Sequence, residues 1–135
     1  MSGETDLNKL IGSMQPVLSE SEYVFAMVEK ATPVLLAKLA PLGTFYEKEG
    51  LTVIVLKANA DVSGLAYQGV FQCITLNVHS SLAAVGLTAA VSTALTQQNI
   101  SANVVAAYYH DHIFVPIAKA KQALTCLQNL AKEAT

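Results

Sequence analysis

Apolar residues in the first half of the chain recur at helical spacing in two short segments. Between residues 6 and 14 they share one face of a predicted helix, for which Thr5 is available as the N-cap. Residues 31–39 predict a second short helix, which Pro41 stops. Two short helices are therefore expected in this half.

Two other segments of the same half are rich in strand-forming residues. The run Tyr23–Val28 lacks strict alternation of apolar and polar residues, which predicts a strand buried on both faces. Residues 44–57 predict a β-hairpin that turns at Glu49 and Gly50, because glycine adopts the positive φ that tight turns require. Residues 58–69 then connect the hairpin to the second half.

The second half begins with a strand and ends with a helix. Residues 70–78 alternate well enough to predict a strand, and apolar residues within 84–95 recur at the spacing of an amphipathic helix. Residues 102–109 and 113–115 predict two further strands. Pro116 begins the last predicted helix, which has one apolar face.

The order of these elements predicts the fold class. The second half is predicted to run strand, helix, strand, tight turn, strand and helix. With a last strand supplied from elsewhere in the structure, this order is a ferredoxin-like split βαβ arrangement. We therefore predict an α+β protein with antiparallel sheets and helices on one face. No linker or low-complexity segment interrupts the chain, so the two expected domains, residues 1–68 and 69–135, should be closely coupled.

Charge is distributed unevenly along the chain. Residues 62–110, a run of 49, contain no Asp, Glu, Lys or Arg. A soluble monomer of this size normally presents charges on each long element, so we expect part of this surface to be covered in a homo-oligomer, a dimer. Residues 82–95 are the most apolar segment, but they are too few and include too many hydroxyl groups for a membrane span.

Composition argues against several classes of protein. The formal net charge is -2, and all the basic residues are lysines, so the bidentate fork that arginine offers to phosphate and guanine is missing. No glycine-rich nucleotide loop occurs, and we expect no nucleic-acid partner and no cofactor. Cys73 and Cys126 lie in apolar patterns and no secretory signal is visible at the start, which predicts a cytoplasmic protein.

Two histidines on either side of an aspartate raise the question of a metal site or a proton relay. His110, Asp111 and His112 are consecutive, and His79 is the only other histidine in the sequence. Two ligands separated by one residue in a hairpin seldom complete a zinc site unaided. Because Asp tolerates the left-handed conformation of tight turns, we interpret His110 and Asp111 as a two-residue turn and expect neither metal nor catalysis there.

A longer stretch around this turn resembles a known family. The strand ending in VHSSL, the AAVGL that follows it, the NISAN step and the hairpin YYHDHIFVP are similar to the ACT domain, as in the regulatory domains of aspartate kinase and the cytosolic arginine sensors of animal cells. Tyr23 and the segment FYEKEGLT resemble the N-terminal portion of the same group, which implies a tandem ACT arrangement. Ser80, Ser81 and the triplet Ala84, Val85, Gly86 replace the usual D-R-P-G at the first corner.

The ACT resemblance implies a regulatory module that binds a small molecule, usually an amino acid, at an interface between ACT units. The site in such proteins lies between the loop that opens the first helix and the start of the second strand. In this chain the corresponding residues are His79, Ser80, Ser81, Val85, Gly86, Leu87, Ile100, Ser101, Ala102 and Asn103.

Elementary chemistry suggests roles for these candidates. A helix N-terminus has unpaired N–H groups and partial positive charge, which suit an α-carboxylate. Ser80 and Ser81 either cap the helix or assist the ligand, and Gly86 lets either a ligand or a strand approach closely. The carbonyl groups of residues 100–102, with Asn103, are candidate acceptors for an α-ammonium group.

Three functions stay open. The first is a non-enzymatic sensor of an amino acid, in which Glu47 or Glu49 is a candidate to contact a basic ligand. The second is a ligand-free ACT scaffold whose uncharged surface binds a protein partner. An enzyme ranks third, because Asp111 is the only acid between residues 62 and 131 and no nucleophile and base stand at a catalytic spacing.

Overall fold

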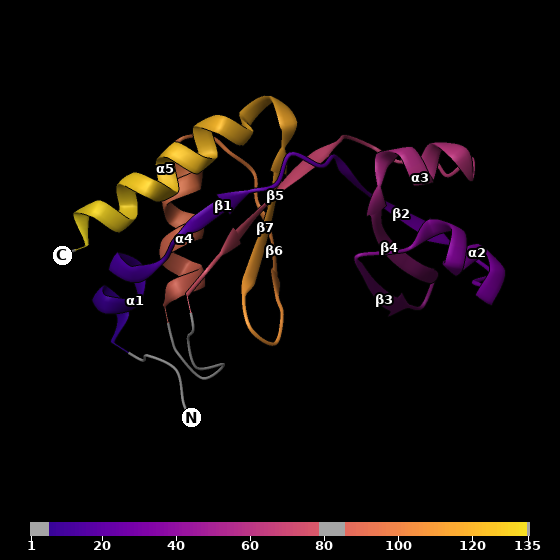
Figure 1. The fold of residues 1–135 in the computed structure, drawn as a ribbon, viewed down its shortest axis with the longest axis horizontal. Helices are drawn as coiled ribbons and strands as arrows, with labels where there is room; N and C mark the ends of the chain where they lie inside the picture. The colour runs from indigo at the N-terminus through magenta and orange to yellow at the C-terminus, as the bar shows by residue number, and fades with distance from the viewer. Residues whose placement is uncertain (1–5, 79–85, 135) are drawn as a thin grey trace. The chain divides into compact units, whose positions relative to one another are not determined.

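Residues 6–20 fold together with the second half of the chain. The computed structural model describes residues 6–78 and 86–134 (Figure 1). One folded unit is Ser21–Phe71, and the other combines Met1–Glu20 with Gln72–Thr135. In space, therefore, the N-terminal segment belongs to the second unit, although the expected division at residue 68 groups it with the first.

The unit Ser21–Phe71 is a three-stranded antiparallel sheet with two helices. Its strand order is β3-β4-β2, and β2 and β4 pair along their whole length, from Tyr23 opposite Leu56 to Val28 opposite Leu51. Alternate strand residues, such as Val24 and Val53, form one core with Leu39 and Ala60 of the helices. The elements are β2 (Tyr23–Val28), α2 (Pro33–Leu39), β3 (Gly43–Glu47), β4 (Gly50–Leu56) and α3 (Lys57–Val62).

Local sequence signals explain the ends of α2. The Thr32 side chain accepts a hydrogen bond from the Leu35 amide at 3.2 Å, and Pro33 occupies the first turn, where its missing N–H costs nothing. At the other end Ala40 is the C-cap, in the left-handed conformation with φ 44°. The helix ends at Leu39, one residue before this left-handed cap and two before Pro41.

Three details of this unit differ from the sequence predictions. The strand β2 is not buried on both faces, because helices cover only one of them and Met27 on the other face is 46% exposed. The hairpin turn is shifted by one residue: Gly50 already pairs with Glu47, so Lys48 and Glu49 form the turn. The expected connector after residue 57 begins as the helix α3, which the sequence prediction missed.

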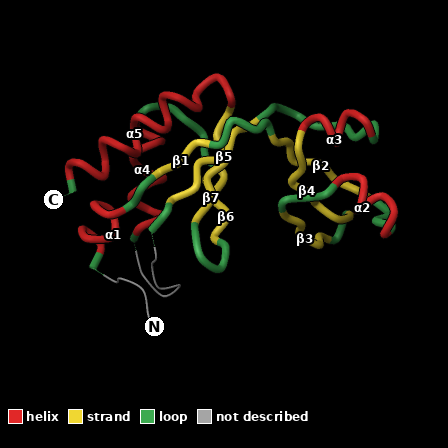
Figure 2. The backbone as a smooth tube through the Cα atoms, in the orientation of Figure 1, coloured by secondary structure: helices red, strands yellow, loops and turns green. Residues whose placement is uncertain are grey.

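The second unit has four strands in the order β1-β5-β7-β6 and three α-helices. The expected fold class, α+β with ferredoxin-like antiparallel sheets, is confirmed. The sequence predicted that the last strand of this unit comes from another part of the chain, and β1, which is too short to be predicted itself, is that strand. It pairs with β5 from Pro16 opposite Leu76 to Leu18 opposite Ile74. The elements are α1 (Leu7–Ser13), β1 (Pro16–Leu18), β5 (Phe71–Leu76), α4 (Leu87–Gln97), β6 (Asn103–Ala106), β7 (Asp111–Pro116), the 3-10 turn η1 (Ile117–Lys119) and α5 (Ala120–Glu133) (Figure 2).

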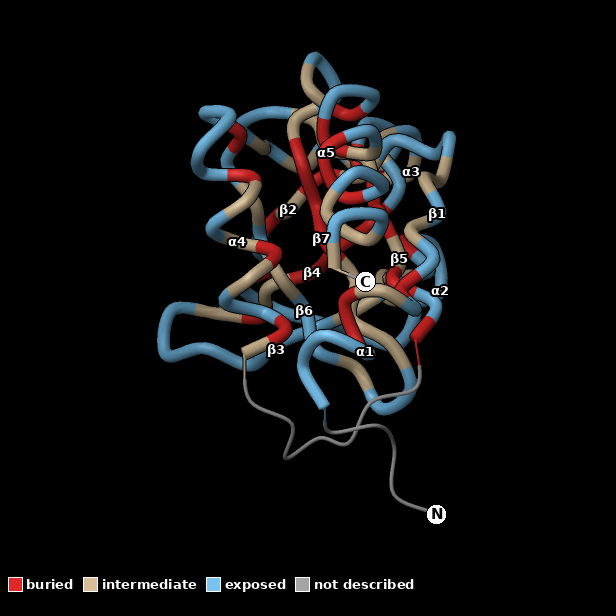
Figure 3. Tube along the Cα trace, turned by 90° about the vertical axis from the view of Figure 1, so that its left-hand side faces the viewer, coloured by how far each residue is buried: buried red, intermediate tan, exposed pale blue. Residues whose placement is uncertain are grey.

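One core joins the three helices of this unit to one face of its sheet. It includes Leu10 of α1, Val91 of α4, Leu127 of α5, Ile74 of β5 and Ile113 of β7, all almost fully buried. Figure 3 shows buried positions alternating with exposed ones along α4, as expected of an amphipathic helix. None of the helices in the described ranges is both long and apolar enough to cross a lipid bilayer.

Two local predictions for this unit were wrong. The N-cap of α1 is Asp6, whose carboxylate accepts from the Lys9 amide at 3.1 Å, rather than Thr5, which lies outside the described residues. The hairpin between β6 and β7 turns two residues earlier than expected: Ala106 pairs with Asp111, the Ala107 amide donates to the His110 carbonyl at 3.1 Å, and Tyr108 and Tyr109 form the tip. Asp111 is therefore a strand residue and not part of a two-residue turn.

Replacing Ala40 by glycine should stabilise the protein. A non-glycine residue in the left-handed conformation costs roughly 1 kcal/mol, which glycine avoids, so we expect Ala40→Gly to raise the free energy of unfolding by about 0.5–1 kcal/mol. The matched control is Ala37→Gly at an exposed position within α2, which should lower it by a similar amount. Urea denaturation measures both changes, and a loss of stability in both variants would contradict this explanation of the cap.

Candidate ligand-binding site

The structure places the expected ligand-binding residues at two ends of the same helix. Gly86 and Leu87 are at the start of α4, whereas residues 100–103 follow its end. Since α4 has 11 residues, its ends are about 16 Å apart along the axis. One unit therefore does not bring the two groups of candidates together, and a site that uses both needs a second ACT-like unit.

The start of α4 differs from the expected one. The helix begins at Leu87, with Gly86 as N-cap in the left-handed conformation at φ 102°, and among the described residues no side chain caps it. Neither Ser80 nor Ser81 is therefore the N-cap. These two serines, together with His79 and Val85, lie outside the described residues.

The described candidate residues differ in whether their side chains or only their backbone atoms can reach a ligand. Leu87 and Ile100 are buried in the core of the unit, so only their backbone atoms are available to a ligand. Ser101 and Asn103 are exposed and Ala102 is half-buried. Asn103, the first residue of β6, is thus a described candidate whose side-chain donors and acceptors reach solvent.

The space beside Gly86 is occupied by another part of the chain. A Cβ atom on Gly86 would lie 3.0 Å from Cδ2 and 3.4 Å from Cδ1 of Leu7 in α1. The positive φ of Gly86 favours glycine, and a side chain there would in addition have to displace the tip of Leu7. Leu7 lies on this side of Gly86, and a ligand contact at Gly86 stays a prediction.

The turn between β6 and β7 lies at the same end of the unit as the start of α4. This follows from the antiparallel order, because β5 runs toward that end, α4 runs away from it and β6 returns to it (Figure 1). Tyr108 and Tyr109 at the turn are 78% and 68% exposed, with ring centroids 4.8 Å apart in an edge-to-face arrangement. The sequence prediction placed both rings within a strand, so it missed this exposed aromatic pair.

Polar groups cluster just inside that turn. The Thr75 hydroxyl and His112 Nδ1 are 2.9 Å apart, and His110 Nδ1 is buried with no hydrogen-bond partner among the described residues. Burial, followed by the charge on His110, lowers the pKa of His112, while burial raises the pKa of Asp111. His112 is accordingly held neutral at neutral pH, as suits a structural hydrogen bond to Thr75.

Neither these residues nor others in the described ranges form a metal cluster. Within residues 6–78 and 86–134 no group of three or more His, Cys, Asp or Glu side chains is placed to hold a metal ion. The pair His110 and His112 with Asp111 therefore offers no assembled site in this part of the chain.

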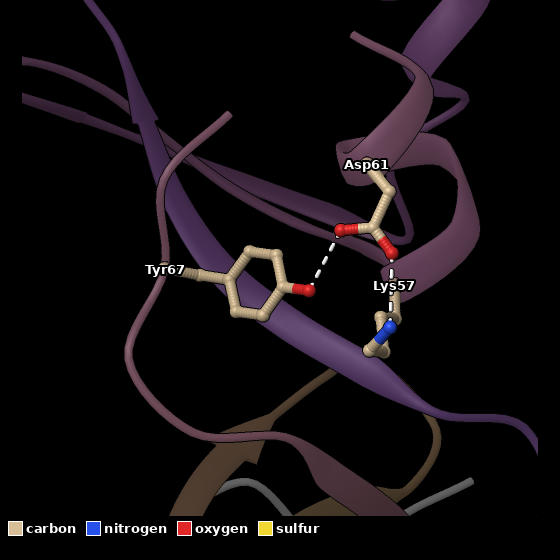
Figure 4. A network of polar contacts seen from close by, with 3 residues as sticks. All are labelled: Lys57, Asp61 and Tyr67. Carbon is tan, nitrogen blue, oxygen red and sulfur yellow. Dashed lines mark hydrogen bonds and ion pairs between the residues drawn. The ribbon is translucent and has the colours of Figure 1, made fainter. Parts of the chain in front are cut away.

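The other unit contains a small charged network (Figure 4). The Asp61 carboxylate accepts from the Tyr67 hydroxyl at 2.7 Å and from Lys57 Nζ at 2.9 Å. The Tyr67 hydrogen bond, and then that of Lys57, lower the pKa of Asp61. This network fastens the segment after α3 to that helix, which is a structural role that the sequence prediction missed.

Glu47, one of two carboxylates considered for a basic ligand, has a partner within its own hairpin. The Thr52 hydroxyl on β4 donates a hydrogen bond to Glu47 Oε1 on β3. This bond pairs the two strands beside the turn. A ligand contact by Glu47 or Glu49 stays a prediction.

Family comparison accounts for the fold. Two family models, each of an ACT domain, match residues 2–72 and 70–129. The chain belongs to the ACT domain family. Its two ACT domains follow one another in tandem, as the resemblance predicted.

Several solved structures are similar to this ACT protein. A Vibrio cholerae protein of unknown function, described as a possible transport protein, is 48% identical with a TM-score of 0.85, and the match covers 93% of this chain and 95% of that one. Aspartate kinase from Clostridium acetobutylicum has a TM-score of 0.70 at 12% identity, over 94% of this chain and 36% of the kinase. The ligand-free regulatory subunit of aspartate kinase from Thermus thermophilus has a TM-score of 0.64 at 9% identity, and the match covers 87% of this chain and 96% of that subunit. The last two similarities concern the fold alone, and no curated protein sequence matches this ACT protein.

Substitution of Gly86 tests the contact with α1. Gly86→Ala should lower the free energy of unfolding by about 1–3 kcal/mol, because it combines backbone strain with a clash against Leu7. Leu7→Ala removes the clash, so the double variant should lose less than the sum of the two single losses. Urea denaturation of the four proteins gives this coupling.

Gly64 provides the matched control for that cycle. It also has a positive φ, of 70°, but a Cβ atom there would meet nothing within 4 Å. Gly64→Ala should therefore show the cost of strain alone and no coupling to Leu7→Ala. Additive losses for Gly86→Ala and Leu7→Ala would contradict the proposed contact.

The Asp61 network predicts a pH-dependent stability. A carboxyl group whose pKa is lower in the folded state stabilises the fold above its unfolded pKa, and this contribution is lost as the pH falls through the folded value. Asp61→Asn should therefore reduce the urea midpoint at pH 7 more than at pH 3. Glu49→Gln, at the exposed hairpin turn of the same unit, is the matched control, and equal effects of Asp61→Asn at the two pH values would exclude this role.

Proposed function

We propose that this protein is a non-catalytic regulatory module that binds an amino acid or a similar small zwitterion. The observation that carries the proposal is the pair of ACT domains covering nearly the whole chain, since ACT domains are typically regulatory ligand-binding modules. The fold is shared with a chain named as a regulatory subunit of aspartate kinase, which supports a non-catalytic role. The module acts in the cytoplasm as a homo-oligomer.

The proposed site has two halves from two copies. The start of α4 in one copy supplies backbone N–H groups for the α-carboxylate. Residues 100–103 of the second copy supply carbonyl oxygens and the Asn103 amide for the α-ammonium group. Because these halves lie at opposite ends of α4, two copies arranged antiparallel would form two equivalent sites.

A ligand-free scaffold is the second candidate, and one observation favours it. Leu7 occupies the space beside Gly86, so a ligand at this corner has only the remaining sides of the helix N-terminus to approach. An ACT domain packed in this way could serve as a rigid surface for a protein partner.

Ligand screening distinguishes the two candidates. At concentrations well above its dissociation constant, one of the standard amino acids should raise the melting temperature, because binding to the folded state alone stabilises it by mass action. Asn103→Ala should then weaken binding roughly tenfold in calorimetry, the loss expected for a hydrogen bond to a charged group. Asn129→Ala, an exposed amide on α5, is the matched control and should bind normally.

Two other outcomes of the screen would change the proposal. No stabilisation by any standard amino acid at millimolar concentration would favour the ligand-free scaffold. Stabilisation that Asn103→Ala leaves unchanged would keep a sensor function but remove residues 100–103 from the site.

A further inference from the structure

The two histidines of the β6–β7 hairpin lie where β7 leaves the core of its unit. Residues 113–115 of β7 are almost fully buried, whereas His110, Asp111 and His112, which precede them, are half-buried. Beyond these three residues, Tyr108 and Tyr109 at the tip are exposed to solvent. His112 therefore marks the boundary between the anchored part of β7 and the end of the hairpin.

The strand β6 contributes few buried contacts to this end of the hairpin. It is the last strand in the order β1-β5-β7-β6, and the described residues pair it with β7 over four positions. Three of its four residues are exposed, including Val105, which lies opposite His112. A segment with few buried apolar contacts opens locally at a lower free energy than the core does.

His112 is joined to β5 by a hydrogen bond that either protonation state can make. Its Nδ1 lies 2.9 Å from the Thr75 hydroxyl, which can donate to a neutral ring or accept from a protonated one. The charged ring is disfavoured for another reason: burial lowers the pKa of His112, and the charge on His110 lowers it further. Proton uptake by His112 is therefore easier when the hairpin end is open to water.

His110 favours the open hairpin for a geometric reason. Its Nδ1 is buried and has no hydrogen-bond partner among the described residues. A protonated imidazole carries an N–H group on both nitrogens, so the closed hairpin would leave one donor without an acceptor. Water supplies that acceptor once the end of the hairpin opens.

The strands of this unit provide little charge to compensate two protonated histidines. The strands β1, β5 and β6 contain no Asp, Glu, Lys or Arg, and Asp111 is the only such residue of β7. The charge of Asp111 raises the pKa of His112, but it is the smallest of the three causes that act on this group. The other titratable groups nearby are Tyr108 and Tyr109 at the tip and Cys73 on β5, whose thiol stays neutral because burial raises its pKa.

We infer that residues 105–112 form a pH-sensitive end of the β6–β7 hairpin, which opens when His110 and His112 take up protons while the rest of β7 stays in the core. A histidine whose pKa is lower in the closed state binds more protons in the open state. The closed state is therefore fully favoured above the ordinary histidine value of 6.5 and loses stability as the pH falls below it. Burial raises the pKa of Asp111, so proton uptake by this carboxyl group works in the opposite sense and favours the closed state.

Hydrogen exchange of the whole chain without any ligand tests this opening. The Ala107 amide, which donates to the His110 carbonyl at 3.1 Å, lies within the proposed segment. Its protection factor, corrected for the intrinsic exchange rate, should fall roughly three- to tenfold between pH 7 and pH 5, as the release of about one coupled proton requires. The Ile100 amide donates to the Leu95 carbonyl at 3.0 Å in the same unit, outside the hairpin, and should keep its protection.

Asparagine at the two histidine positions removes proton uptake and keeps a polar side chain. Asparagine offers a donor and an acceptor near the position of Nδ1 but does not titrate, so the double variant His110→Asn with His112→Asn should change the Ala107 protection factor by less than about twofold between the two pH values. Asp111→Asn in the same segment is the matched control. It should retain the fall or enlarge it, because the carboxyl group opposes opening.

Three results would overturn the inference. They are an Ala107 amide equally protected at both pH values, a double variant that keeps the fall, and a parallel loss of protection at Ile100, which would indicate global unfolding. Circular dichroism establishes that each variant is folded, and the comparison of Ala107 with Ile100 in the wild-type protein decides the question even where a variant is not. No amino acid is present in these measurements, so their outcome is independent of the ligand proposal.

Discussion

The short antiparallel pairing between β1 and β5 is the interaction on which the second unit depends. Three residues, from Pro16 to Leu18, complete the sheet beside Ile74 and Leu76. They also bring α1 onto the core, where Leu10, Ile11 and Met14 are buried. Without this pairing the core would lose three large apolar side chains, and Leu7 would no longer pack beside Gly86 at the start of α4.

The same constraint explains why the two units differ. A ferredoxin-like unit needs a strand beside its first strand, and in the second unit β1 takes this place beside β5. The unit Ser21–Phe71 receives a single paired residue, Phe71, whose ring packs edge-to-face on Phe25 with centroids 5.5 Å apart. The residues just before Phe71 complete this side of the unit, where Leu65, Tyr67 and Val70 pack against its core.

The sequence predicted most elements because their apolar periodicity is strong. The prediction failed where contacts between distant parts of the chain determine the local structure. The strand β2, the helices other than α3 and the ferredoxin-like order followed from pattern alone. The strand β1 has three residues, too few for a period, and the turn at residues 107–110 places Tyr108 and Tyr109 in solvent although aromatic residues favour strands. The Gly86 contact with Leu7 joins residues 79 positions apart, so no local pattern reveals it.

The exposed positions of α4 show how part of the uncharged run, residues 62–110, meets solvent. On α4 the buried face is Leu87, Val91 and Leu95, while the exposed positions include Thr88, Thr93 and Gln97. Hydroxyl and amide groups bind water without charge, so this face does not by itself require a covering partner. The stronger reason to expect two copies is geometric: about 16 Å of helix separates Leu87 from Gln97, and the candidates at residues 100–103 follow that far end. Two antiparallel copies are the simplest way to join two such ends in one site.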